Sequence, residues 1–199
     1  MTRIVLSAAA LLASCLAAAY GQEAKTTWWP ITETATMVYR DASGRLVCTA
    51  RTTRSSITNT DTTVYWNAAG RYLGTARTTY LPLTNTATTI YSGAPDGLNG
   101  TARTTWSSMT HSATTTYSGA VSRMVRMART TYSPLTGSAT TTFSGPPEGM
   151  RGTARTTLSL LTNSATTRFS GSDCSERGSG ALPCLMLTSP ALTLPHAGR

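Results

Sequence analysis

The sequence has few of the residues on which enzymes depend. Histidine occurs only at His111 and His196, and 8 Asp and Glu residues stand against 17 Lys and Arg, which gives a formal charge of +9. No Ser-His-Asp set and no recurring pair of carboxylates can be assembled from so few groups. His111 lies at a turn position that Asn85, Gly137 and Asn163 occupy elsewhere, so we expect a turn role for it. These absences predict a protein that is not an enzyme and has no cofactor.

Large aliphatic residues are also scarce. Beyond the first residues, Leu, Ile, Val and Phe make up only about one residue in eight, below the roughly 20% expected of a globular domain. Only 13% of residues are charged, which does not fit a charged disordered chain either. The abundant residue is threonine, with 41 copies. Because its side chain is β-branched, threonine favours strands, and the composition therefore indicates β-structure.

Cysteine is too sparse and too scattered for a metal site. Cys48, Cys174 and Cys184 follow the leader, and none forms a CxxC pair. Cys174 and Cys184 could form a disulfide in an oxidising compartment and stabilise the last part of a repeat array. The alternative is three unpaired thiols, and we predict no metal site in either case.

The first residues have the pattern of a secretory signal peptide. Met1-Thr-Arg3 is basic, and an apolar run follows from Ile4 to Ala19. We expect residues 1–21 to be removed, unless Leu12-Ala13-Ser14-Cys15 acts as a lipobox and Cys15 becomes lipidated. The run is shorter than the roughly 20 residues that span a bilayer. The protein is therefore expected to be secreted, periplasmic or on the cell surface, with no transmembrane segment in the mature chain.

An internal repeat dominates the rest of the sequence. Ala-Arg-Thr-Thr recurs at intervals of 26 residues, and Ala-Lys-Thr-Thr occurs one interval upstream. Six units therefore start at Ala24, Ala50, Ala76, Ala102, Ala128 and Ala154, within residues 22–178. Residues 179–199 break the period and are expected to be a cap or a disordered tail.

Three columns of the repeat carry most of its information. The first is basic: Lys25, Arg51, Arg77, Arg103, Arg129 and Arg155. The second is apolar: Ile31, Ile57, Leu83, Met109, Leu135 and Leu161. The third is aromatic: Tyr39, Tyr65, Tyr91, Tyr117, Phe143 and Phe169. Because Thr-rich stretches alternate with turn residues, each unit is predicted to be a β-hairpin joined to the next.

We therefore expect an all-β fold in which tandem hairpins form an elongated repeat sheet or a β-solenoid. A lone hairpin is marginally stable, so the units must pack against one another. The aromatic and apolar columns are expected to form a thin, continuous core. Six stacked cations would repel at the spacing of about 4.8 Å in a solenoid, and this favours the hairpin sheet, where the spacing is about 9.6 Å.

Two segments carry a resemblance to a known family. Residues Tyr39–Thr49 and Tyr65–Thr75 share a Tyr-x-Asp/Asn-Ala-x-Gly-Arg pattern, which resembles YD (Rhs-type) repeats and, more closely, short YRDASGRxxGTA repeats of secreted bacterial proteins. The resemblance fades in later units and implies fold and secretion rather than an activity. In physical terms, the Asp or Asn side chain would close the turn and Gly would adopt a positive φ.

The sequence leaves three functions open. The first is a structural or adhesive role at the cell surface or outside the cell. The second is binding of anionic glycan or lipopolysaccharide by the basic column, with Trp28, Tyr80, Trp106 and Tyr132 as stacking aromatics. An envelope partner fits an exported protein better than nucleic acid, which is not expected. Ice binding by the threonine arrays is the least favoured, because adjacent threonines point to opposite faces of a strand.

Overall fold

A computed structural model describes residues 23–41, 43–93, 99–123, 125–145 and 152–170. Within these ranges the chain forms strands and short 3-10 turns, and the predicted all-β hairpin structure is confirmed. The strands are β1 (Glu23–Trp29), β2 (Thr34–Arg40), β3 (Leu46–Ser55), β4 (Thr60–Asn67), β5 (Tyr72–Leu81), β6 (Thr86–Gly93), β7 (Gly100–Ser107), β8 (Ser112–Gly119), β9 (Met127–Ser133), β10 (Ser138–Ser144), β11 (Gly152–Ser159) and β12 (Ser164–Ser170). The 3-10 turns are η1 (Pro30–Thr32), η2 (Pro82–Thr84) and η3 (Ala120–Arg123).

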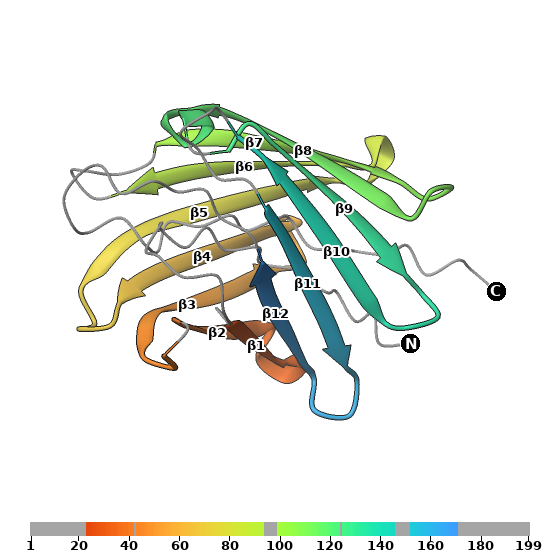
Figure 1. Cartoon of the computed structure of the whole chain (residues 1–199). Coiled ribbons are helices and arrows are strands. Elements are labelled where there is room, and N and C mark those ends of the chain that lie inside the picture. Colours follow the sequence, from red (N-terminus) through yellow and green to blue (C-terminus); the bar gives the residue numbers. More distant parts are fainter. Residues whose placement is uncertain (1–22, 42, 94–98, 124, 146–151, 171–199) are drawn as a thin grey trace.

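The strands form one closed antiparallel barrel in which each strand pairs with its neighbours in sequence (Figure 1). Closure occurs between the first and last strands, where Thr26 of β1 is opposite Ala165 of β12. The predicted elongated sheet or solenoid is therefore wrong. Sheets twist and coil, and this sheet coils far enough for β12 to meet β1, so that both edges are paired. Equivalent residues do lie two strands apart, as in the hairpin sheet.

The turns within the six hairpins all lie at one end of the barrel, which we call the tip end. Each is four residues long, and its last residue has a positive φ of 45–58°: Glu33, Asn59, Asn85, His111, Gly137 and Asn163. Asn and Gly tolerate this left-handed conformation best, which explains their frequency in the column. The turn role predicted for His111 is confirmed.

These turns also connect neighbouring hairpins. The carbonyl of the positive-φ residue accepts a hydrogen bond from a backbone N–H in the adjacent hairpin, as between Tyr80 and Asn59 at 2.9 Å. The same bond joins the two ends of the repeat, because Trp28 N–H donates to the Asn163 carbonyl at 2.8 Å. The closure is thus made by the same contact that joins the internal units.

At the opposite end, two turns have the predicted side-chain closure. Asp41 Oδ1 accepts hydrogen bonds from the Ser43 and Arg45 N–H groups, and Asn67 Oδ1 accepts from the Ala69 and Arg71 N–H groups. Gly44 and Gly70 have φ of 80° and 77°. A hydrogen bond from the Ser43 hydroxyl is the main cause that lowers the pKa of Asp41 to about 2.

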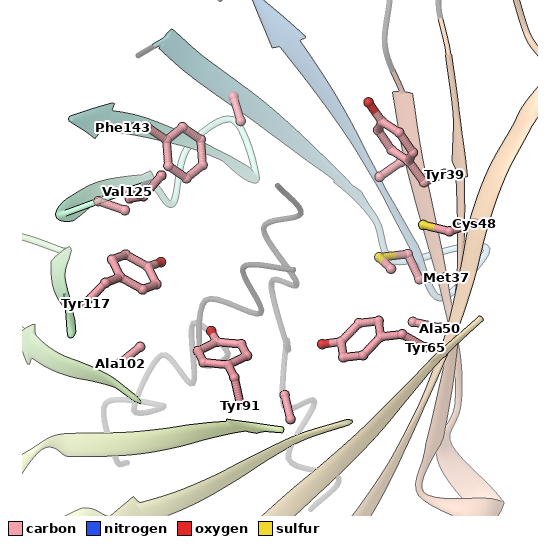
Figure 2. Packing of buried hydrophobic residues seen from close by; sticks show 14 residues of the cluster. Met37, Tyr39, Cys48, Ala50, Tyr65, Tyr91, Ala102, Tyr117, Val125 and Phe143 are labelled. Atoms are coloured by element: carbon pink, nitrogen blue, oxygen red, sulfur yellow. The ribbon is translucent and has the colours of Figure 1, made fainter. Parts of the chain in front are cut away.

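The core lies on the inner face of the barrel. Ala24, Ala50, Ala76, Ala102, Ala128 and Ala154 pair across the strands with the aromatic column, and this layer is buried except for the half-buried Phe169. In Figure 2, Tyr65, Tyr91 and Tyr117 point inward from different strands. Burial is the main cause that raises the pKa of Tyr39 above its usual range, and the nearby Asp41 adds to it.

A second interior layer consists of threonines. Each of the last five units pairs one threonine of its first strand with another directly across on its second strand, and the hydroxyls are hydrogen-bonded to each other at 2.7–2.9 Å. Thr78 and Thr89 are such a pair, and both are buried. Because the two hydroxyls of each pair are partners, the interior can hold these ten polar side chains at low cost.

The apolar column is not part of the core, contrary to the prediction. Its members are 92–101% exposed at the tip end: Ile31, Ile57, Leu83, Met109, Leu135 and Leu161. The reason is that they lie within the four-residue turns, beyond the last paired residues of the strands, where no inner face exists. Alanine, aromatic and threonine side chains form the interior in their place.

Candidate functional site

The basic column forms a belt around the outer wall of the barrel. Lys25, Arg51, Arg77, Arg103, Arg129 and Arg155 are all exposed, and we call them the basic belt. Their neighbours in sequence, such as Ala76 and Thr78, are buried, so the belt residues point outward by strand alternation. Every second strand carries one, at a spacing of about 9.6 Å.

The cross-strand neighbours of the belt are threonine or aliphatic side chains, apart from Arg168 opposite Arg155, and none of them is acidic. Arg77, for example, is opposite Thr62 on one side and Ile90 on the other. Within the described residues, the two ion pairs are Arg45–Asp41 at 3.1 Å and Arg168–Glu23 at 3.3 Å. Neither includes a belt residue, so the belt cations are available to an external anion.

The predicted stacking aromatics do not accompany the belt. Trp28, Tyr80, Trp106 and Tyr132 are three residues beyond the belt residues of their units, and this odd offset places them on the inner face. They are half-buried and lie near the tip end. The structure does not bring the cations and these aromatics together, because they lie on opposite faces of the barrel wall.

The inward aromatics belong to a ring that sequence reasoning missed. The ring has one large side chain on every second strand, Trp28, Arg54, Tyr80, Trp106, Tyr132 and Leu158, and a smaller residue directly opposite each, Ala35, Asp61, Ala87, Ala113, Ala139 and Ala165. We call these twelve residues the tip-end ring. It is the third interior layer, after the aromatic and threonine layers.

Several contacts fix one side of the tip-end ring. Tyr80 donates a hydrogen bond from its hydroxyl to Asp61 Oδ2 at 2.6 Å, and its ring stacks on Trp106 with centroids 6.3 Å apart and planes 26° apart. The guanidinium of Arg54 lies over the Tyr80 ring, 5.6 Å from its centroid. One feature of the sequence could have revealed this ring. Unit two alone has a cation, Arg54, and an acid, Asp61, where the other units have an aromatic or aliphatic residue and an alanine.

The cysteines and the leader are only partly described. Cys48 is buried in β3 and is disulfide-bonded, with a partner outside the described residues. The predicted disulfide of Cys174 and Cys184, the lipidation of Cys15, the signal peptide and the tail also lie outside them. Among the described residues, no three His, Cys, Asp or Glu side chains are grouped as metal ligands.

Comparison with known proteins adds no assignment. No family model, no curated protein and no solved structure matches the chain. The resemblance of Tyr39–Thr49 and Tyr65–Thr75 to YD repeats therefore stays a prediction. The part of the chain that the structure describes contains no helix long and apolar enough to cross a membrane.

Proposed function

We propose that this protein is an exported, non-enzymatic barrel that adheres to anionic polysaccharides of a cell envelope through its basic belt. The observation that carries the proposal is the arrangement of Lys25, Arg51, Arg77, Arg103, Arg129 and Arg155 at equivalent positions around the outer wall, exposed and without ion-pair partners among the described residues.

The spacing of the belt suits a polymer better than a small ion. Adjacent belt residues lie about 9.6 Å apart, close to the screening length at physiological salt, so their mutual repulsion is modest. A flexible chain carrying repeated carboxylates or sulfates can contact several of them at once, and binding then gains from multivalency. Guanidinium groups bind such oxyanions with two parallel hydrogen bonds, and five of the six belt residues are arginine.

The other functions receive less support from the geometry. For ice binding, each adjacent threonine pair is divided, as Thr78 is buried and Thr79 is exposed. The outer threonines also lie on a curved wall rather than on a flat array. For a purely structural polymer built by edge pairing, β1 and β12 offer no free edge because they pair with each other.

The test compares two double variants that lose the same charge. R77A/R103A removes two belt residues. R45A/R71A removes two exposed arginines in the turns at the end of the barrel opposite the tip end. We expect R77A/R103A to weaken binding to immobilised heparin and to lipopolysaccharide by roughly five- to thirtyfold, from about 0.5–1 kcal/mol per exposed charge contact. Its salt dependence should also become shallower.

R45A/R71A should retain most of the wild-type affinity and its salt dependence. Equal losses in both variants would show that net charge alone binds the polymer, and the belt proposal would then fail. Unchanged binding by R77A/R103A would contradict it as well. Surface plasmon resonance at rising salt concentration measures both quantities.

A further inference from the structure

Three hydrogen-bond donors in the tip-end ring lack an acceptor within the part of the chain that the structure describes. Trp28 Nε1, Trp106 Nε1 and Arg54 Nη1 are buried atoms, and among the described residues none of them has a hydrogen-bond partner. Buried N–H groups in native proteins are nearly always paired with protein, water or ligand. All three belong to the same interior layer of the barrel, which makes this layer a candidate for binding oxygen acceptors.

The same layer contains a charge that the repeat does not require. Five of the six units have an aromatic or aliphatic residue at the position of Arg54 and an alanine at the position of Asp61. Placing a cation and a carboxylate inside the barrel costs desolvation energy that an alanine and an aromatic residue avoid. The other five units form the same fold without them, so unit two alone brings a cation and a carboxylate into this layer.

The aromatic side of this layer is held in place before any ligand arrives. Tyr80 is fixed by its hydrogen bond to Asp61, by the Arg54 guanidinium over its ring and by stacking on Trp106. Asp61 is buried, while Arg54, Tyr80 and Trp106 are half-buried and thus within reach of solvent. Ligand sites of barrels often lie at their mouths, with rigid aromatic walls and a few polar groups that set orientation.

We propose that the tip-end ring binds an acidic saccharide residue of the uronic acid type. The carboxylate of the sugar accepts a hydrogen bond from Arg54 Nη1, and its hydroxyl or ring oxygens accept from the indole N–H groups of Trp106 and Trp28. The C–H face of the sugar packs on the electron-rich face of an aromatic ring. This ligand supplies the oxygen acceptors that the three donors lack among the described residues.

This site is independent of the basic belt. The ring lies on the inner face and the belt on the outer face, so neither set of residues touches the ligand of the other. The protein could bind a polyanion outside without binding a sugar inside, and the reverse also holds. The two proposals can therefore fail separately.

The experiment measures binding of glucuronate by tryptophan fluorescence and by saturation-transfer NMR on the full chain. W106F keeps an aromatic ring and removes one donor, and R54Q removes the cation. W29F is the matched control, because Trp29 is an exposed tryptophan adjacent to the ring residue Trp28. Glucose and benzoate are the comparison ligands, and circular dichroism confirms that each variant is folded.

We expect glucuronate to bind more tightly than glucose and benzoate, with at least a tenfold loss in W106F and in R54Q. W29F and R45A/R71A should bind glucuronate as the wild type does. Absence of glucuronate binding, or binding that W106F and R54Q leave intact, would overturn the proposal. Loss of glucuronate binding in R77A/R103A would assign the sugar to the basic belt and overturn the proposal. Tighter binding of benzoate than of glucuronate would indicate an aromatic acid as the ligand and would overturn it as well. If R54Q does not fold, the comparison of glucuronate binding by W106F and by W29F decides whether the proposal holds.

Discussion

Phe143 and Leu135 are both apolar and only eight positions apart, yet their environments are opposite. Phe143 is 3% exposed on the inner face of β10, and Leu135 is 99% exposed in the turn before it. The stability of the barrel should therefore depend on the first and hardly on the second.

We predict that F143A lowers the free energy of unfolding by about 3–5 kcal/mol, the usual cost of removing a buried aromatic ring. L135S should change it by less than about 0.5 kcal/mol, as is usual for surface positions. Urea unfolding followed by circular dichroism measures both values. If L135S lowered the free energy of unfolding as much as F143A does, Leu135 would have to pack against other residues, which would contradict its exposure.

At this scale the sequence predicted the aromatic column correctly and the apolar column wrongly. Tyr91 and Phe143 alternate with polar residues within strands. Because successive side chains of a strand point to opposite faces, this alternation places both on the buried face. Leu83 and Leu135 lie between proline and threonine in short turns, where no period exists. Hydrophobicity alone suggested a core position for them, and only the length of the paired strands shows otherwise.

The hairpin turn is the element that repeats most regularly. Its last residue adopts a positive φ in all six copies, with Asn in three, Gly in one, and Glu and His in the others. Asn85 at φ 49° represents the common case. Non-glycine residues with a branched Cβ are the least compatible with this conformation.

We predict that N85G leaves the melting temperature close to that of the wild type, because Gly137 already serves at the equivalent position. N85V should destabilise the protein by roughly 1–2 kcal/mol, the cost of forcing a branched residue into the left-handed region. Differential scanning calorimetry of N85G and N85V measures both melting temperatures. Equal melting temperatures would show that the turn can change its conformation without cost.

Elements were the scale at which the sequence was most informative. The hairpins followed from threonine-rich stretches between turn residues, and the turns closed by Asp41 and Asn67 followed from their side-chain oxygens. The tip-end ring did not follow, because Arg54 and Asp61 are close in space only once the register of β3 and β4 is known.

Closure of the barrel is a property of the whole molecule. Each hairpin and its link to the next are local, but the pairing of β1 with β12 depends on the summed twist and stagger of all strands. No single unit of the sequence contains that information, which explains why an open array was expected.

Hydrogen exchange tests the closure directly. We predict that amides of β1 and β12 on the sides that face each other, such as those near Thr26 and Ala165, exchange as slowly as the amides of β5 and β6. In an open sheet they would be edge amides and would exchange orders of magnitude faster. Exchange that is fast in β1 and β12 and slow in β5 and β6 would contradict the closed barrel.

The hydrogen bond from Trp28 to Asn163 makes the junction of the chain ends equivalent to every other junction between hairpins. The ring of units therefore has no structural beginning. A gene that gained or lost one 26-codon segment would change the circumference of the barrel rather than its length. The number of units is therefore limited by the geometry of closing a circle, where an open array could grow without limit.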